Sequence, residues 1–330
     1  MRALALVLFA ACSYQPGAGK LTSDGPLGDG PLTPDTPDTP EIDAPLDAFV
    51  GPPPSACVTK WLSGTPPSFT TPEFVRGGGA IATQADERDP WLTKDQLIIY
   101  FSRPITTDTD VLFATRVQVT GDFSSPFIKT SLSDDAVEDS KVAITDDDLT
   151  AFIATRRANG EGASDIWQAT RATGGTALFD ALTQTHLGAV NDGGNQLDPH
   201  VSADGLRLYY ANGSPQQIVV SSRVSATSDF SAPVVIAGIG DPAGDADPTL
   251  TADERVLIFS SQRTGLGGTD LWYATRAERD QPFGAVQALT FNSTDNDADP
   301  HVTADGCRIY FATERFDGND FDLFVTDMMP

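Results

Sequence analysis

Residues 198–211 read DPHVSADGLRLYYA, and two later stretches repeat this pattern closely: DPTLTADERVLIFS from Asp247 and DPHVTADGCRIYFA from Asp299. Weaker copies are DPWLTKDQLIIYFS from Asp89 and KVAITDDDLTAFIA from Lys141. The five copies follow one another at intervals of 49 to 57 residues. A period of this size is typical of repeat architectures, because each unit exposes an apolar face that only its neighbours can cover.

Each unit contains the signals of four short strands. After a turn, the quoted stretch continues as an alternating apolar run such as Leu206-Leu208-Tyr210, which has the period of two of a β-strand. A polar segment leads to a second run, for example Asp270-Leu271-Trp272. Beyond it, in four units, a Phe opens a fourth strand-like segment: Phe123, Phe179, Phe230 and Phe283. Four strands joined by turns describe one blade of a β-propeller.

The fifth unit lacks a fourth segment, because only four residues follow Thr326. Residues 69–75, which read FTTPEFV, match the pattern of the fourth segments in the other units. Pairing this early strand with the last blade closes the ring and removes an exposed strand edge. The sequence therefore predicts an all-β, five-bladed propeller closed by an N-terminal strand. The alternative is a propeller with a sixth, diverged blade.

The order of Asp-Pro, Ser/Thr-x-Asp-Gly, an apolar run, Arg and Asp-Leu-Trp resembles the WD-repeat-like β-propeller repeat of TolB-type proteins. The resemblance covers residues 69 to 330. The sequence departs from it where Lys141-Val142 replaces Asp-Pro and where Glu254 replaces Gly. The resemblance implies a periplasmic or envelope-associated binding scaffold, whereas the repeat itself implies no reaction.

The N-terminus has the features of a lipoprotein signal. Arg2 precedes an apolar run from Ala3 to Ala11, and Phe9-Ala10-Ala11-Cys12 resembles a bacterial lipobox. We therefore predict a signal peptide over residues 1–11 and lipidation of Cys12; an ordinary signal peptide is the alternative. The resulting location is the bacterial cell envelope, as an outer-membrane lipoprotein that faces the periplasm or the surface. The lipid anchor would be its contact with the membrane.

Composition divides the rest of the chain in two. Residues 12–56 are rich in Pro, Asp, Gly and Thr, which predicts a disordered acidic tether, and residues 57–330 form the propeller. The formal net charge of −25 argues against nucleic acid as a partner, because there is no basic surface to release counterions. It is compatible with cations and basic partners.

Two cysteines remain beside Cys12. Cys57 precedes the closing strand, and Cys307 lies in the blade that this strand must join. In an oxidising compartment their pairing would lock the seam of the ring with a disulfide. Two unpaired thiols are the alternative that the sequence leaves open.

Equivalent positions of the inner strands converge near the axis of a propeller. The residues that open the units are therefore expected to form a ring, with two further acids upstream of it: Asp89, Lys141, Asp198, Asp247 and Asp299, with Asp245 and Asp297. Grouped carboxylates could bind Ca²⁺ or a basic group. The structural alternative is that Asp before Pro only forms a turn. No cofactor other than Ca²⁺ is suggested.

Trp91, His200 and His301 occupy one matching position in three units and are expected to line the funnel. Two histidines from non-adjacent blades without a third ligand do not predict a zinc site.

No catalytic residues are predicted, because the sequence contains none of the common hydrolase or phosphate-binding motifs. We expect a non-enzymatic scaffold that binds an envelope protein or a cell-envelope glycan through the propeller face. The alternative is a glycoside hydrolase or lyase with axial carboxylates, for which Glu87 and Glu138 are the acids that break the repeat symmetry.

Overall fold

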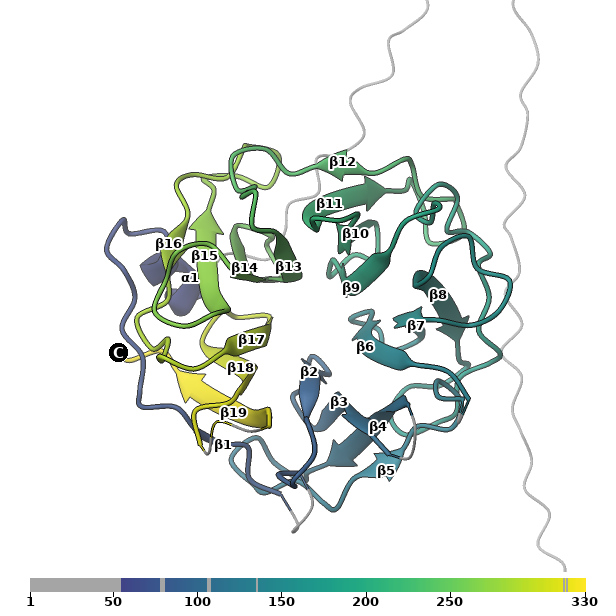
Figure 1. Cartoon of the computed structure of the whole chain (residues 1–330), viewed down its shortest axis with the longest axis horizontal. Helices are drawn as coiled ribbons and strands as arrows, with labels where there is room; N and C mark the ends of the chain where they lie inside the picture. Colours follow the sequence, from purple (N-terminus) through teal and green to yellow (C-terminus); the bar gives the residue numbers. More distant parts are fainter. Residues whose placement is uncertain (1–54, 78–80, 106–107, 135, 317, 319) are drawn as a thin grey trace, which may run out of the picture. The chain divides into compact units, whose positions relative to one another are not determined.

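Five antiparallel sheets stand around one axis in the computed structural model of the chain (Figure 1). The structure describes residues 55–77, 81–105, 108–134, 136–316, 318 and 320–330. The predicted signal peptide, Cys12 and nearly all of the tether lie outside the described residues. The prediction of an all-β, five-bladed propeller is confirmed.

The innermost strand of each blade contacts the innermost strands of the two neighbouring blades, so that five strands surround the axis. In chain order they are β2 (Arg88–Leu92), β6 (Asp139–Ile144), β9 (Gln196–Val201), β13 (Asp245–Leu250) and β17 (Asp297–Val302). These strands contain the Asp-Pro segments of the repeat.

The second strands form the core of the fold. They are β3 (Ile98–Pro104), β7 (Thr150–Thr155), β10 (Arg207–Asn212), β14 (Val256–Ser261) and β18 (Arg308–Thr313). Strand β14, for example, is buried at every position. The alternation seen in the sequence therefore does not separate a buried face from an exposed one, because a blade is covered by a neighbour on both of its faces.

The third strands are as long as the second strands, whereas the fourth strands are much shorter and more exposed. The third strands are β4 (Thr109–Thr115), β8 (Asp165–Thr170), β11 (Gln217–Ser222), β15 (Asp270–Thr275) and β19 (Asp322–Asp327). The fourth strands have two residues each: β5 (Phe127–Ile128), β12 (Val234–Val235), β16 (Gln287–Ala288) and β1 (Glu73–Phe74). Blade 2 has only a single bridge at this place, between Gln168 and Thr183.

The phenylalanines that were predicted to open the fourth strands lie just before them and have another role. Each ring is covered by the Arg that follows the third strand, with the guanidinium carbon 4.2 to 4.4 Å from the ring centroid in the pairs Arg116–Phe123, Arg171–Phe179, Arg223–Phe230 and Arg276–Phe283. The Nε of the same Arg donates to a carbonyl of the turn between the first and second strands, at 2.7 to 2.8 Å. The Arg therefore ties the outer edge of a blade to this turn.

The early segment closes the ring as predicted. Strand β1 pairs with β19, with Glu73 opposite Val325 and Phe74 opposite Phe324. Phe69 bridges to Met328, and the next residue, Thr70, donates its N–H to the carbonyl of Asp327 at 2.9 Å. Ser124 makes the equivalent bond to Thr115 in blade 1 at 2.7 Å, which identifies Phe69 as the counterpart of Phe123.

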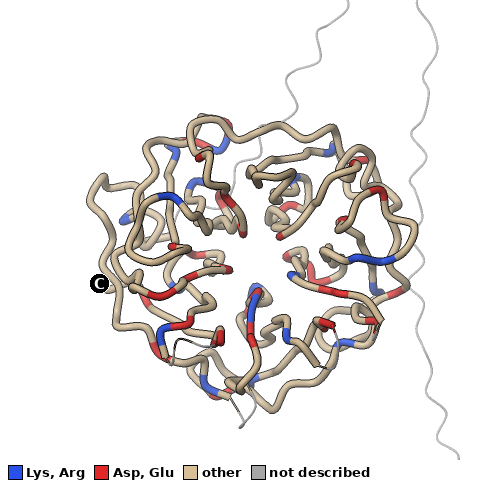
Figure 2. Tube along the Cα trace, in the orientation of Figure 1, with Lys and Arg blue, Asp and Glu red and all other residues tan. Residues whose placement is uncertain are grey.

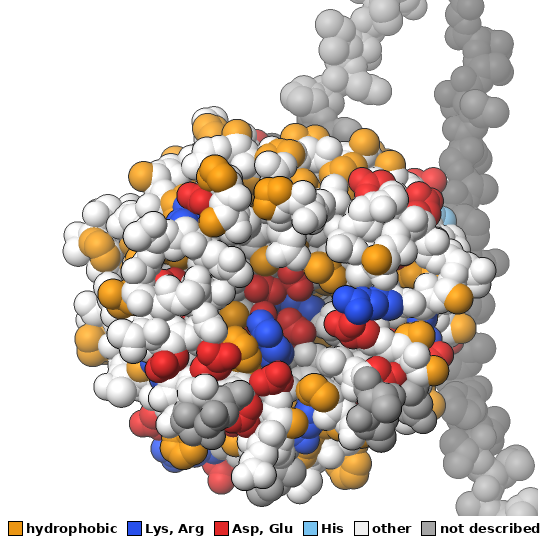
Figure 3. All heavy atoms as spheres, viewed as in Figure 1, with side chains coloured by type: hydrophobic (Ala, Val, Ile, Leu, Met, Phe, Trp, Pro, Cys, Tyr) orange, Lys and Arg blue, Asp and Glu red, His pale blue; other side chains and the backbone are white. Residues whose placement is uncertain are grey.

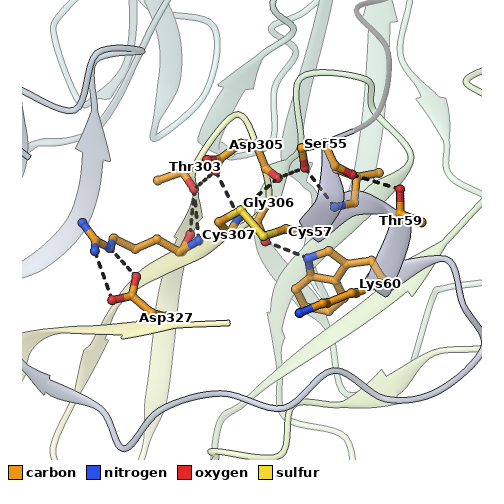
Figure 4. Close-up of a disulfide and its surroundings, with 12 residues drawn as sticks. Ser55, Cys57, Thr59, Lys60, Thr303, Asp305, Gly306, Cys307 and Asp327 are labelled. Carbon is orange, nitrogen blue, oxygen red and sulfur yellow. Dashed lines mark hydrogen bonds and ion pairs between the residues drawn. A yellow bond between two sulfur atoms is a disulfide. The ribbon is translucent and has the colours of Figure 1, made fainter. Parts of the chain in front are cut away.

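A short helix that the sequence analysis missed lies beside this seam. Helix α1 (Ala56–Trp61) is capped by Ser55, whose Oγ accepts the N–H of Val58 at 3.0 Å. The Sγ atoms of Cys57 and Cys307 are 2.04 Å apart, so a disulfide joins α1 to blade 5 (Figure 4). The Nε1 of Trp61 donates to the carbonyl of Gly306 at 2.9 Å.

Gly306 permits this close approach. Its φ is +70°, and a Cβ at this position would lie 3.3 Å from the Trp61 indole nitrogen and 3.1 Å from Thr251. A larger residue would therefore both strain the turn and push the helix away.

No helix among the described residues is long and apolar enough to cross a membrane.

Candidate functional site

The Asp-Pro segments are β-bulges on the innermost strands. Four of the aspartates, Asp89, Asp198, Asp247 and Asp299, have φ between +52° and +59°. Each innermost strand shifts register against its neighbour at this place. A left-handed conformation is uncommon outside Gly but is tolerated by Asp, and a bulge redirects the side chain. Asp-Pro is thus both a structural feature and the means of placing a carboxylate near the axis.

We call Asp89, Lys141, Asp198, Asp247 and Asp299 the axial ring; each comes from a different blade. One carboxylate oxygen each of Asp89, Asp198 and Asp247 lie within 4.8 Å of one another. The Nζ of Lys141 lies 3.8 Å from an oxygen of Asp247, two blades away, so that the ammonium group reaches across the axis. The structure therefore brings together the ring that the sequence predicts. Figure 2 shows acidic and basic positions of the inner strands around the axis.

Neighbouring groups hold the ring in place. The Nε of Arg88 donates to Oδ2 of Asp299 at 2.7 Å, and the Oγ of Ser102 donates to Oδ2 of Asp89 at 2.6 Å. The Asp198 carboxylate accepts the N–H of Asp247 at 3.4 Å. Sequence analysis missed Arg88. Arg88 could have been found from its position directly before Asp-Pro, because the other units have uncharged residues there: Ser140, Leu197, Ala246 and Ala298.

The ring concentrates negative charge in a largely buried place, with Asp89, Asp247 and Asp299 buried and Asp198 half-buried. Burial, and then the charge of Asp299, raises the pKa of Asp89 to about 6. Burial and the neighbouring carboxylates raise the pKa of Asp247 well above its usual value. Burial disfavours the charged form of Lys141, but the surrounding aspartates outweigh it and raise the pKa of the ammonium group. The ring therefore keeps Lys141 charged and favours uptake of further protons.

A cleft of about 390 Å³ opens above the ring, and we call it the axial cleft. Four ring aspartates form its floor, and groups from neighbouring strands and turns line its wall: Asp86, Arg88, Ser102, Pro104, Thr109, Glu138, Ser140, Leu197, Gln216 and Ala246. Figure 3 shows acidic and basic side chains gathered around the central hollow of this face. Carboxylates and cations in one cleft offer hydrogen-bond acceptors and donors to the same ligand.

Asp245 and Asp297 do not line the axial cleft. Each is buried in an ion pair with an Arg of the same blade, Arg263 at 2.5 Å and Arg315 at 2.6 Å. Both residues were predicted to lie beside the ring. The bulge changes the direction of the strand between them and the ring aspartates, so their side chains enter the blade instead. Glu87 has the same position in blade 1 and pairs with Arg103 at 2.8 Å.

Trp91, His200 and His301 lie together at the other end of the innermost strands. The Trp91 ring centroid is 5.2 Å from that of His200 and 4.7 Å from that of His301. They line a small pocket of about 50 Å³ beside the turns that follow these strands, which we call the turn-side pocket. Burial lowers the pKa of His200 to about 3, and the pKa of His301 also lies well below its usual value.

The residues that could hold a metal ion are those of the axial ring. Among the described residues, Asp89, Asp198 and Asp247 form the only group of three or more ligand side chains with suitable spacing. Oxygen ligands of this kind suit Ca²⁺. However, the Lys141 ammonium group already lies among these carboxylates. The Nε2 of His301 accepts the N–H of Leu92 at 3.3 Å, so this nitrogen is not available as a ligand.

The sheets and the axial cleft define the class of protein: a five-bladed β-propeller with a charged cleft at its axis. No protein-family model matches the chain. No curated protein matches it in sequence either.

Similarity is found among solved structures, at low identity. The α-L-arabinofuranosidase PaAbf62A from Podospora anserina, in complex with cellotriose, has a TM-score of 0.53 and 10% identity over 78% of this chain and 95% of its own. Zg3597, a family 117 glycoside hydrolase produced by Zobellia galactanivorans, has a TM-score of 0.51 and 10% identity over 79% of this chain and 90% of its own. TolB from Acinetobacter baumannii has a TM-score of 0.48 and 12% identity over 75% of this chain; this chain spans 55% of that structure. At these identities the similarity establishes the fold alone.

Proposed function

We propose that the chain is a non-enzymatic binding scaffold of the bacterial cell envelope that holds its ligand in the axial cleft. The observation that carries this proposal is the composition of the cleft floor. Four carboxylates and the Arg88 guanidinium line a cleft to which all five blades contribute, and the buried ammonium group of Lys141 lies 3.8 Å from the Asp247 carboxylate.

Lys141 supports the presence of a ligand. Its side chain is 1% exposed, and its Nζ has no hydrogen-bond acceptor among the described residues. A buried donor without a hydrogen-bond acceptor costs about 1–3 kcal/mol, and the ion pair of Lys141 with Asp247, at 3.8 Å, is longer than a hydrogen bond. An oxygen atom placed in the ring would relieve this cost. A hydroxyl group fits best, because it can accept a hydrogen bond from Lys141 and donate one to an aspartate.

The location in the envelope rests on two features of the chain. The Cys57–Cys307 disulfide is typical of proteins that fold in oxidising compartments. The lipobox-like sequence that ends in Cys12 supplies an anchor to a lipid surface. The acidic segment that follows would act as the tether between anchor and propeller.

Co-sedimentation with envelope material from which detergent has removed the lipid tests the proposal, because a lipid anchor would otherwise hold the chain on the membrane whatever the cleft binds. The full chain should sediment with the envelope fraction, and the double variant Asp198→Asn, Asp247→Asn should lose about nine-tenths of this binding, since one tenfold step corresponds to only ~1.4 kcal/mol. Asp122→Asn, which changes an exposed acid outside the cleft, is the matched control. Equal sedimentation of all three proteins would overturn the proposal.

A glycoside hydrolase is the second candidate function, because Asp86 and Glu138 line the cleft outside the ring. The glycoside hydrolases with similar folds make it worth testing. One observation argues against it: Glu87, an acid that breaks the repeat symmetry, is buried in its pair with Arg103. Hydrolysis of a glycan panel that is lost in Glu138→Gln would favour the enzyme.

A further inference from the structure

The axial cleft continues into a second hollow between blades 3 and 4. This hollow has a volume of about 400 Å³ and shares four lining residues with the axial cleft: Arg88, Gln216, Ala246 and Asp247. Because the two hollows share these lining residues, they adjoin each other, and together they make up a groove that begins at the axis. We call the outer part the polar arm.

The polar arm differs from the axial cleft in its chemistry. Its charged residues, Arg88 and Asp247, stand at the end that it shares with the cleft. The rest of its lining consists of amides, hydroxyls, small residues and Pro: Asn195, Gly213, Ser214, Pro215, Gln216, Ala243, Gly244, Ala246, Ser260, Ser261, Gln262, Thr269 and Ala298. The arm therefore favours a neutral ligand that can exchange hydrogen bonds along its length.

Three amide side chains in the arm are free to bind such a ligand. Asn195, Gln216 and Gln262 form no side-chain hydrogen bond with another described residue. They come from the entry to β9, the turn before β11 and the end of β14, so they surround the arm from two blades. Each amide presents donors and an acceptor.

A single ligand that fills the groove must match the hydrogen-bonding groups of both parts. At the ring a ligand meets four carboxylates and the Arg88 guanidinium, so it must both donate and accept hydrogen bonds, and in the arm it must do the same with neutral amides. An anion would be repelled by the four aspartates, and a simple cation would make no use of the polar arm. A polyhydroxylated chain meets both requirements.

We infer that the groove binds a linear oligosaccharide, with one sugar unit over the axial ring and the next units in the polar arm. This inference rests on the proposed function. Each part of the groove lies within the ~300–1,000 Å³ of sites that hold one drug-sized ligand, so the whole groove holds more than one sugar unit. No aromatic residue lines either part among the described residues, so recognition depends on hydrogen bonds rather than stacking.

Calorimetric titration of the full chain with linear xylo-, cello- and chito-oligosaccharides, from the monosaccharide to the hexasaccharide, tests the inference. In at least one series, affinity should rise about tenfold from the monosaccharide to the trisaccharide and then level off. The double variant Gln216→Ala, Gln262→Ala should reduce trisaccharide affinity to that of the monosaccharide. Gln217→Ala, which changes the exposed neighbour of Gln216 outside the groove, should behave as wild type.

Two results would overturn the inference. If affinity does not depend on the length of the oligosaccharide, the polar arm is not part of the binding site. The absence of binding in every series would exclude the saccharide; if the chain still sedimented with the envelope in an Asp198- and Asp247-dependent manner, the scaffold function would stand with another ligand.

Discussion

The Nζ atom of Lys141 lies 3.8 Å from Oδ1 of Asp247, across the axis of the propeller. Four blades place an aspartate at the bulge of the innermost strand, and blade 2 places this lysine there instead. This one break in the ring of aspartates therefore places a positive charge among four negative ones. The ring therefore resembles a cation site in which the Lys141 ammonium group takes the place of the ion.

Replacing Lys141 by Met should turn the ring into a site for Ca²⁺. Oxygens within 4.8 Å of one another fit around an ion whose ligands lie at ~2.3–2.6 Å. Loss of one partner of a buried ion pair costs about 3–5 kcal/mol, so Lys141→Met should melt at a lower temperature than wild type and recover when Ca²⁺ is added. Thermal unfolding with Ca²⁺ or chelator measures this.

Lys129 offers the matched control. It is also buried, but its Nζ donates to the carbonyls of Thr176 and Ala177, at 3.0 and 2.9 Å, outside the ring. Lys129→Met should be destabilised without any response to Ca²⁺. If Ca²⁺ raises the melting temperature of wild type as much as that of Lys141→Met, Lys141 does not occupy the site.

The disulfide at the seam should contribute to stability. It closes a loop with a sequence separation of 250 residues, and removal of a native disulfide typically costs about 2–5 kcal/mol. Urea unfolding of wild type should shift to lower midpoints when a reductant is added. Cys57→Ser should show the lower urea midpoint both with and without reductant. If the midpoint of wild type does not change when the reductant is added, the prediction is wrong.

Phe69 should be as important for the fold as its counterparts within the blades. Its ring packs 5.1 Å from Phe291 and 5.6 Å from Trp61, measured between centroids. Truncation of a buried Phe to Ala costs about 3–5 kcal/mol. We expect Phe69→Ala and Phe123→Ala to lower the free energy of unfolding by similar amounts in urea titrations. A loss below about 1 kcal/mol for Phe69→Ala alone would mean that the seam is not part of the cooperative unit.

The repeat explains why the blades and the closing strand could be predicted. Each unit has the same order of strands, so the missing fourth segment of blade 5 pointed to residues 69–75. The direction of individual side chains was harder to predict. Asp245 and Asp247 are two residues apart, and a regular strand would place both on one face, but the bulge at Asp247 turns only that carboxylate to the axis.

Features outside the repeat carried weaker signals. Helix α1 has only six residues, too few for a periodic pattern, and it depends on contacts with Gly306 that the sequence does not reveal. The polar arm is built from loops of two blades whose sequences differ, so no motif marks it.

The ring aspartates should favour the folded state more strongly as the pH falls from 7 to 5. The pKa of Asp89 is about 6, and burial and like charges also raise those of Asp198 and Asp247, whereas an unfolded Asp titrates near ~3.9. In this window these aspartates take up protons in the folded state but not in the unfolded chain, and this increases the free energy of unfolding. His200 and His301 act in the opposite direction, because burial keeps them neutral in the folded state whereas an unfolded His titrates near ~6.5. Lys141 and Arg88, the cations that face the ring, remain charged throughout.

Melting temperatures at pH 7, 6 and 5 check this dependence. On acidification the melting temperature of Asp247→Asn should rise less, or fall more, than that of wild type, because the variant lacks one of the groups that take up a proton. Asp122→Asn, outside the ring, should keep the wild-type slope. If the melting temperature changes with pH in the same way in all three proteins, the ring does not contribute to the pH dependence of stability.

Crosslinking in the native envelope tests most directly whether the axial cleft holds the ligand. A photo-reactive residue at Thr109 lies in the wall of the axial cleft, and one at Lys94 lines the turn-side pocket at the other end of the innermost strands. We predict a reproducible adduct from Thr109 that disappears with Asp198→Asn, and none from Lys94. Adducts from Lys94 that do not depend on Asp198, with none from Thr109, would contradict the account.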